Sequence, residues 1–365
     1  MVSGFQKGES VQIRGGVRYA LDSKVMNDHI PERYYMFRLT CVLILVVGLS
    51  IPGFGQEWKP VTVELLKSEK TGYGGLCGVI IHPPSGDVIV NLSDCGLFRS
   101  GDQGTTWQRL ESAELKGRTE TPLCMMLDPL EHKRLVSAFV YGSPIIVSPQ
   151  LSKGWKTLDV KSTHVDWCAV DWNDPELGFI LTLKHESGDL LLVSRDGGKN
   201  FEEVGKGYGP AWIFDRKTAV VAQAKSKENQ QPGLLRTTDA GKTFHRCGDD
   251  YARALPRFKS GTLFWLTTTG LIRSSDQGQT WKRLSDVKEG ICGPVFGKDT
   301  QQLFILTSGG VRESTDGGFT WLSPIALPSA MKGANHLSWV EYDSVHDIIY
   351  VMKMGSELYQ MPRAN

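Results

Sequence analysis

Ser100-Gly-Asp-Gln-Gly-Thr-Thr-Trp107 decides the fold, because four more segments of the chain repeat its pattern. Ser or Thr stands first, Asp third, Gly fifth, a polar residue seventh and an aromatic residue eighth. The other copies are Ser194-Arg-Asp-Gly-Gly-Lys-Asn-Phe201, Thr237-Thr-Asp-Ala-Gly-Lys-Thr-Phe244, Ser274-Ser-Asp-Gln-Gly-Gln-Thr-Trp281 and Ser314-Thr-Asp-Gly-Gly-Phe-Thr-Trp321. A sixth segment, Ser148 to Trp155, retains a serine, a glycine and the aromatic residue but lacks the aspartate. We call the five complete copies the aspartate turns.

Each aspartate turn is expected to join two β-strands. An aspartate carboxylate accepts hydrogen bonds from backbone N–H groups of its own turn, and glycine supplies a position with positive φ. Five equivalent residues do not form one convergent active site, so a structural role is assigned to the repeated aspartates, Asp102, Asp196, Asp239, Asp276 and Asp316.

A short apolar stretch, such as Leu97-Phe-Arg-Ser100, precedes every copy. The same kind of stretch precedes Ser148 and ends the chain at Leu358-Tyr-Gln-Met361, and the seven recur at intervals of 48, 46, 43, 37, 40 and 47 residues. A four-stranded blade of a β-propeller takes about 40–50 residues. The sequence therefore predicts an all-β, seven-bladed β-propeller of four-stranded blades, with six blades and a terminal hairpin as the alternative.

The octapeptide resembles the Asp-box, or bacterial neuraminidase repeat, of β-propellers in the sialidase-like superfamily. That resemblance implies that each box lies between the third and fourth strands of a blade. The seventh repeat ends before its box, so its blade needs an outer strand from elsewhere. Glu57-Trp58-Lys-Pro-Val-Thr-Val-Glu64 resembles the strands that follow the boxes, and we expect it to close the ring and remove the exposed edges.

The N-terminal segment is expected to lie outside this fold. Residues 36–55 have an early Arg38, an apolar stretch over 39–51 and small residues near Gln56, which is typical of a signal peptide. We expect translation to begin at Met36, residues 1–35 to be a non-native or disordered extension, and 56–365 to form one propeller domain. A secreted or periplasmic location follows, with a membrane anchor formed by an uncleaved 39–51 segment as the alternative.

Charge and cysteine content exclude several classes of protein. The chain has 41 basic and 40 acidic residues, a formal charge of +1, whereas a nucleic-acid-binding protein needs an excess of Lys and Arg. No metal-binding pattern is present and no cofactor is implied. Six cysteines follow the signal segment, and Cys77, Cys124, Cys168 and Cys292 recur near the start of innermost strands. Buried packing is expected for them, with a disulfide such as Cys77–Cys95 as the alternative.

The face opposite the aspartate turns carries the more varied side chains. It is formed by the links between blades and by the turns between second and third strands. A ligand site is expected there, from the candidates His164, Trp167, His185, Tyr251, Arg253 and His336.

Residues 73–83 and 91–99 resemble the first blade of xyloglucan-cleaving endoglucanases built from two seven-bladed propellers. That resemblance implies a catalytic role for Asp94. Glycoside hydrolysis generally uses a second carboxylate, for which Asp166, Glu186 and Asp250 are candidates. This chain departs from those enzymes in having a single propeller.

Two kinds of function therefore remain open. The repeat also resembles that of sortilin-type receptors and of photosystem II assembly factors, which implies a rigid binding or assembly platform. We expect a monomer that binds a glycan or an envelope or extracellular protein, and no nucleic acid. A xyloglucanase-like or sialidase-like glycoside hydrolase is the alternative, although the Phe/Tyr-Arg-Ile-Pro motif of sialidases is absent from the mature chain.

Overall fold

The computed structural model describes residues 57–110, 117–118, 124–142, 145–148, 150–151, 154–158, 160, 164–184, 186–225, 230–252 and 254–363. The extension over 1–35 and the signal segment over 36–55 lie outside these residues. No described helix is long and apolar enough to span a membrane.

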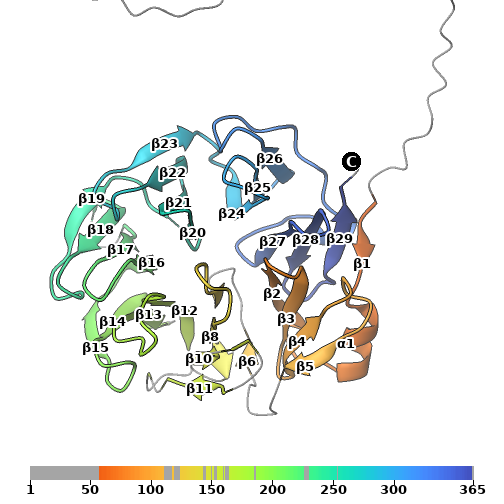
Figure 1. Ribbon diagram of the computed structural model, residues 1–365, viewed down its shortest axis with the longest axis horizontal. Helices are drawn as coiled ribbons and strands as arrows, with labels where there is room; N and C mark the ends of the chain where they lie inside the picture. The colour runs from red at the N-terminus through yellow and green to blue at the C-terminus, as the bar shows by residue number, and fades with distance from the viewer. Residues whose placement is uncertain are drawn as a thin grey trace, which may run out of the picture. The chain divides into compact units, whose positions relative to one another are not determined.

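The chain folds into seven antiparallel blades arranged as a β-propeller, as the repeat predicted (Figure 1). Blade 1 contains β2 (Leu76–His82), β3 (Asp87–Leu92), β4 (Gly96–Ser100) and β5 (Gln108–Leu110). Blade 2 contains β7 (Met125–Leu127), β8 (Leu135–Ala138), β10 (Ile145–Ser148) and β11 (Lys156–Thr157), beside the pair β6 (Gly117–Arg118) and β9 (Tyr141–Gly142).

The next three blades are complete. Blade 3 contains β12 (Val165–Val170), β13 (Ile180–Lys184), β14 (Leu190–Ser194) and β15 (Glu202–Gly205). Blade 4 contains β16 (Tyr208–Ile213), β17 (Ala219–Gln223), β18 (Gly233–Thr237) and β19 (His245–Gly248). Blade 5 contains β20 (Arg257–Lys259), β21 (Thr262–Thr267), β22 (Gly270–Ser274) and β23 (Lys282–Ser285).

The last two blades are less regular. Blade 6 contains β24 (Gly290–Phe296), β25 (Leu303–Thr307) and β26 (Gly310–Ser314), and a bridge between Val311 and Ile325 marks its fourth position. Blade 7 follows the short 3₁₀ helix η1 (Ser329–Met331) and contains β27 (Ser338–Asp343), β28 (Ile348–Lys353) and β29 (Tyr359–Pro362).

The N-terminal segment closes the ring, as expected. Strand β1 (Lys59–Pro60) pairs with β29 as the outer strand of blade 7. The strand is shorter than the predicted Glu57–Glu64 segment, because helix α1 (Val63–Glu69) begins directly after it. Thr62 joins the two chain ends: its buried hydroxyl donates to Glu357 Oε2 at 2.7 Å and accepts the Leu358 N–H at 2.9 Å.

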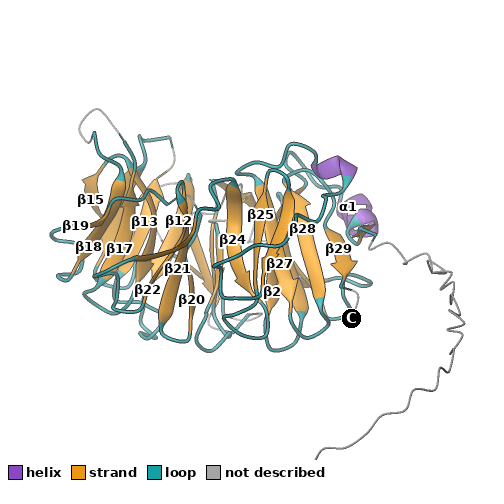
Figure 2. Cartoon of the chain, turned by 90° about the horizontal axis from the view of Figure 1, so that it is seen from above, coloured by secondary structure: helices purple, strands orange, loops and turns teal. Residues whose placement is uncertain are grey.

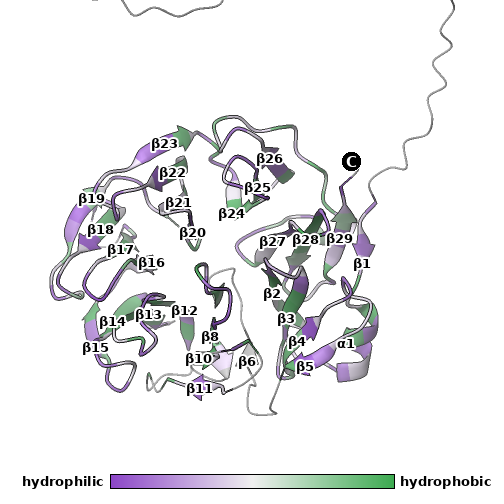
Figure 3. Cartoon of the chain, viewed as in Figure 1, coloured by the Kyte–Doolittle hydropathy of each residue, from purple (hydrophilic) through white to green (hydrophobic). Residues whose placement is uncertain are grey.

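The core lies between neighbouring blades. Strands of adjacent blades contribute to each apolar cluster, for example β12–β14 with β16 and β17 around the fully buried Trp167. Figure 3 shows that inner strands such as β2 and β3 are mainly hydrophobic, whereas the outer strands β15 and β19 are hydrophilic. Figure 2 shows the strands running between two loop-covered faces. Each blade therefore depends on its neighbours for burial.

The cysteines occupy the positions that the repeat predicted. Cys77, Cys124, Cys168 and Cys292 are buried in or next to innermost strands. The Cys77 thiol donates to the Gly75 carbonyl and the Cys95 thiol to the Glu69 carbonyl, both at 3.5 Å. No disulfide joins Cys77 to Cys95 in the described part of the chain.

Candidate functional site

The five aspartate turns share one hydrogen-bond pattern. In the last copy, the Ser314 hydroxyl donates to Asp316 Oδ1 at 2.8 Å and accepts the Gly318 N–H at 2.8 Å. The Thr320 N–H donates to Asp316 Oδ1 and the Thr320 hydroxyl to Oδ2. Equivalent bonds surround Asp102, Asp196, Asp239 and Asp276. Every aspartate carboxylate in these turns is occupied by its own turn.

The glycine of each turn abuts the preceding blade. At Gly278 a Cβ would lie 2.3 Å from Val220 of blade 4, and at Gly318 it would lie 2.7 Å from Leu271 of blade 5. Both residues also have positive φ, at 78° and 92°. Only glycine satisfies both the backbone angle and the close approach. The aspartate turns therefore lock blade to blade.

The aspartate turns are expected to make the stability of the fold decrease at acidic pH. Hydrogen bonds from the Thr320 side chain and backbone lower the pKa of Asp316 to about 2, from about 3.9 in an unfolded chain. A lowered pKa stabilises the fold above the unfolded value, and this contribution is lost as pH falls toward 2. The stability difference between the wild type and Asp316→Asn, measured by urea unfolding, is expected to shrink between pH 4 and pH 2. A constant difference would contradict the assignment.

A second series of aspartates follows the innermost strands, and the sequence analysis missed it. In the turn between first and second strands, an aspartate accepts N–H groups two or three residues later. Asp128 Oδ1 accepts from Leu130 and Glu131, and Asp343 Oδ1 accepts from Val345 and His346. Asp171, Asp215 and Asp299 occupy equivalent turns. The sequence carried a signal for this series, because each of the five aspartates lies four to nine residues before the second strand of its blade.

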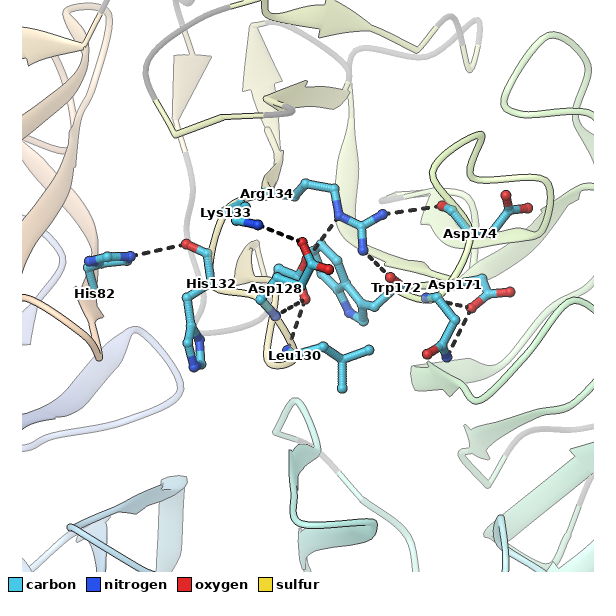
Figure 4. Close-up of polar contacts among 11 residues, drawn as sticks. His82, Asp128, Leu130, His132, Lys133, Arg134, Asp171, Trp172 and Asp174 are labelled. Carbon is cyan, nitrogen blue, oxygen red and sulfur yellow. Dashed lines mark hydrogen bonds and ion pairs between the residues drawn. The ribbon is translucent and has the colours of Figure 1, made fainter.

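The turn of blade 2 is held by an ion pair within the turn and by hydrogen bonds to backbone carbonyls of blade 3 (Figure 4). Arg134 Nε donates to Asp128 Oδ2 at 2.9 Å, and Arg134 also donates to the carbonyls of Asp174 and Trp172. On the other side, His82 Nε2 lies 3.1 Å from the His132 carbonyl. Figure 4 shows Leu130 and the His132 ring on the same side of this turn. The turn is thus fixed to blades 1 and 3.

An axial cavity of about 210 Å³ lies at the end of the innermost strands, on the face of the aspartate turns. Its walls are largely apolar, and Trp212 stacks on Phe258 with the ring centroids 5.4 Å apart. Six blades contribute: the lining comes from β2, the blade-2 turn, β16, β20, β24 and β27. The site was expected on the opposite face, whereas this cavity lies on the aspartate-turn face.

Charged groups also line the cavity. Arg257 Nη2 lies 2.8 Å from Glu341 Oε1, and the two side chains are 25% and 8% exposed. Burial raises the pKa of Glu341, and the Arg257 guanidinium opposes that rise. Lys259 Nζ donates to the Gly297 carbonyl at 3.2 Å and lies 5.2 Å from the centre of the Phe296 ring. The cavity thus combines apolar walls with a buried ion pair and a lysine.

Two exposed apolar side chains lie in turns that contribute to the lining of the cavity. Leu130 is 42% exposed on the blade-2 turn, next to the lining residue Pro129, and Val345 is 51% exposed on the blade-7 turn, next to the lining residue Ser344. His132 also lines the cavity, and its Nδ1 is buried without a hydrogen-bond partner among the described residues. Apolar groups exposed beside a pocket are typical of a surface that binds a partner.

The catalytic candidates are spread over the opposite face, and of the four only Asp166 and Glu186 share a blade, blade 3. Asp94 is exposed in the β3–β4 turn with φ of 61°, and no described residue forms a hydrogen bond or ion pair with its carboxylate. Asp250, between blades 4 and 5, pairs with Arg283 at 2.9 Å. Asp166 lies at a bulge in β12 and is half-buried.

Glu186 lies beside another predicted residue, His164. Its Oε2 lies 3.4 Å from His164 Nδ1, and its Oε1 accepts the Tyr141 hydroxyl at 3.1 Å. The Tyr141 and His164 rings meet edge-on with centroids 4.6 Å apart. Sequence reasoning missed Tyr141, which comes from blade 2 and meets the blade-3 residues only in the folded ring.

The remaining ligand-face candidates are scattered. Trp167 is fully buried between blades 3 and 4 and does not reach that face, which corrects its assignment as a surface residue. Tyr251 packs partly buried against the apolar cluster that includes blades 4 and 5, and His336 is exposed before β27. His185 and Arg253 lie outside the described residues. In the described part of the chain, no group of three or more His, Cys, Asp or Glu is arranged to hold a metal ion.

Comparison with known proteins extends the fold assignment. No family profile and no curated protein matches this chain. Among solved structures, the GH74 xyloglucanase from Xanthomonas campestris has a TM-score of 0.55 and 14% identity, covering 80% of this chain and 43% of that chain. The extracellular domain of the one-component system BT4673 from B. thetaiotaomicron has a TM-score of 0.54 and 12% identity, covering 85% and 40%.

The WD40 repeats of RRP9 give a TM-score of 0.52 at 11% identity, covering 84% of this chain and 99% of theirs. This chain thus spans less than half of the first two proteins and nearly all of the third. The likeness shows the β-propeller fold, which enzymes, sensor domains and WD40 proteins share.

Proposed function

We propose that this protein is a non-catalytic binding propeller and that part of its ligand enters the axial cavity. The observation that carries the proposal is the cavity itself, whose lining is mostly apolar and includes a small number of charged and polar side chains. Ligand pockets in proteins generally have this composition. The rigid contacts between blades hold the walls in place before the ligand arrives, which lowers the cost of binding.

A protein ligand fits this cavity better than a glycan. The walls include Ile80, Met126, Leu255 and Val295, which are at most 7% exposed and offer no side-chain hydrogen bonds to sugar hydroxyls. Sugar hydroxyls that face these four side chains would lack partners, at a cost of about 1–3 kcal/mol each. An apolar side chain of a partner protein would fill the same space without that cost. Leu130 and Val345 at the mouth extend the apolar contact surface.

Hydrolysis of a glycan remains the second candidate, and the Tyr141–Glu186–His164 cluster is the observation in its favour. Against it, Asp94 and Asp250 belong to different blades and Asp250 is paired with Arg283. We expect no cleavage of xyloglucan or sialosides by the wild type. Cleavage that Asp94→Asn or Glu186→Gln abolishes would overturn the binding proposal.

The binding proposal is tested with two matched surface variants. Leu130→Asp places a charge at the cavity mouth, whereas Phe319→Asp places one on an aspartate turn of the same face, where Phe319 is 48% exposed. We expect a partner identified by affinity purification with the wild type to bind Leu130→Asp at least tenfold more weakly and Phe319→Asp unchanged, measured by titration with the purified partner. Equal binding of all three proteins would contradict a site at this mouth.

Export is part of the proposal, because residues 36–55 have the pattern of a signal peptide. N-terminal sequencing of the exported protein tests it, and a mature chain that retains Val2 would contradict it.

A further inference from the structure

The axial cavity is lined by two cations, Arg257 and Lys259, and two carboxylates, Asp128 and Glu341. Arg257 and Lys259 stand two residues apart on β20 and therefore project to the same side of the strand. Both reach toward later blades, Arg257 to Glu341 of blade 7 and Lys259 to Gly297 of blade 6, whereas Phe258 between them stacks on Trp212 of blade 4. Two cations therefore face the cavity from one strand.

The carboxylates of the cavity balance only one of these cations. Glu341 pairs with Arg257 through a single nitrogen, Nη2, so the other guanidinium donors form no hydrogen bond with any described residue. Asp128 also lines the cavity, but Arg134 and two backbone N–H groups occupy its carboxylate. No described carboxylate lies within ion-pair distance of Lys259 Nζ, which contacts a carbonyl and an aromatic ring.

Burial lowers the pKa of Lys259, and the Asp299 carboxylate opposes that shift only in part. The ammonium group therefore loses hydration without gaining a counter-charge in contact. An anion placed beside it would restore the lost stabilisation, because charge-assisted hydrogen bonds are the stronger class.

We propose that the axial cavity binds a carboxylate carried on a hydrophobic body the size of one amino-acid side chain. The carboxylate contacts Lys259 and the unengaged donors of Arg257, and the hydrophobic body lies against Phe258, Phe296 and the aliphatic wall. Such a group is supplied either by a small free acid or by the C-terminal residue of a polypeptide. The inference rests on the proposed binding function and names the chemistry of the part that enters.

The test uses probes that differ in one charge. N-acetyl-phenylalanine and its C-terminal amide have the same hydrophobic body, and calorimetric titration of the full chain compares their affinities. We expect the acid to bind at least tenfold more tightly than the amide. A pentapeptide ending in phenylalanine and free 3-phenylpropionate then distinguish the two sources, since the source that supplies the natural group gives the tighter complex.

A pair of lysine variants assigns the charge preference to the cavity. Lys259→Met keeps the length of the side chain and is expected to lower the affinity for the acid about tenfold while leaving the amide unchanged. Lys282→Met is the matched control, because Lys282 also lies over a phenylalanine ring, at 5.6 Å from Phe319, but on the outer strand β23. Lys282→Met is expected to bind the acid as the wild type does.

Equal affinity for acid and amide would overturn the inference, and so would absence of binding by every probe. The acid–amide comparison in the wild type needs no variant to fold. Failure here is distinguishable from failure of the proposed function, because the Leu130→Asp experiment measures the identified partner rather than the probes.

Discussion

Glu341→Ala is expected to destabilise the propeller by roughly 3 kcal/mol, since removing one partner of a buried ion pair leaves the other charge without compensation. Arg257 loses its carboxylate partner at a position where three quarters of its side chain is covered. The expected loss is at the lower end for buried pairs, because the cavity still admits water to the guanidinium. Urea unfolding at neutral pH measures the change in the unfolding midpoint.

Two controls separate the buried charge from general damage. The double variant Arg257→Met, Glu341→Leu removes both charges and is expected to lie within about 1 kcal/mol of the wild type. Lys67→Ala breaks the exposed Lys67–Glu64 pair and is expected to cost no more than about 0.5 kcal/mol. If the double variant is as unstable as Glu341→Ala, the uncompensated charge is not the cause.

Thr62→Val is expected to destabilise the ring by about 1–3 kcal/mol through loss of its hydroxyl. The substitution conserves the shape of the side chain. It leaves the buried Leu358 N–H without an acceptor and removes the hydrogen bond to Glu357. Both contacts join residues almost 300 positions apart in the sequence. Because Thr62 joins the chain ends, we also expect amide exchange of β29 to increase more than that of β13. Hydrogen exchange monitored by mass spectrometry measures both strands.

Thr105→Val is the matched control for the ring-closing contact. Thr105 is exposed and its hydroxyl donates to the Asp102 carbonyl within one aspartate turn. Solvent replaces that bond, so the change is expected to be a few tenths of a kcal/mol. Equal effects of the two substitutions, or uniform exchange across all blades, would contradict the role assigned to Thr62.

The fold was predictable because the same eight-residue turn recurs along the sequence at the spacing of propeller blades. Each Ser–Asp–Gly–aromatic turn places its own hydrogen bonds within eight residues, so local chemistry identifies it, and the spacing then gives the blades. Ring closure was also predictable, since Leu358 to Met361 lacked an outer strand. Helix α1 was not predicted: its first two residues, Val63 and Glu64, were expected to end a strand, and only Leu65 within the helix is buried.

The axial cavity was not predictable from the same patterns. Its lining comes from six blades, and residues such as Ile80 and Tyr342 are separated by most of the chain. No local motif marks which inner-strand residues converge, because the lining residues come from strands that are far apart in the sequence. The Arg257–Glu341 pair spans 84 residues for the same reason.

On the opposite face the sequence had the reverse effect: it suggested functional residues that the structure does not leave accessible. Polar residues in loops, such as Asp94 in a turn within blade 1 and Asp250 in a link between blades, suggest a function in the sequence because loops carry many binding residues. In the structure, Asp250 is committed to Arg283 and Trp167 is fully buried. On this face the residue types showed which side chains could bind or react, but burial and ion pairing decide which of them remain accessible.

Site-specific photocrosslinking tests most directly where the ligand binds. Benzoylphenylalanine is introduced separately at Val345 by the cavity mouth, at Phe319 on the outer part of the same face, and at Asp94 on the opposite face; all three side chains are exposed. With the purified partner present, the account predicts a crosslink from position 345 and none from 319 or 94. A crosslink from position 94 without one from 345 would contradict it.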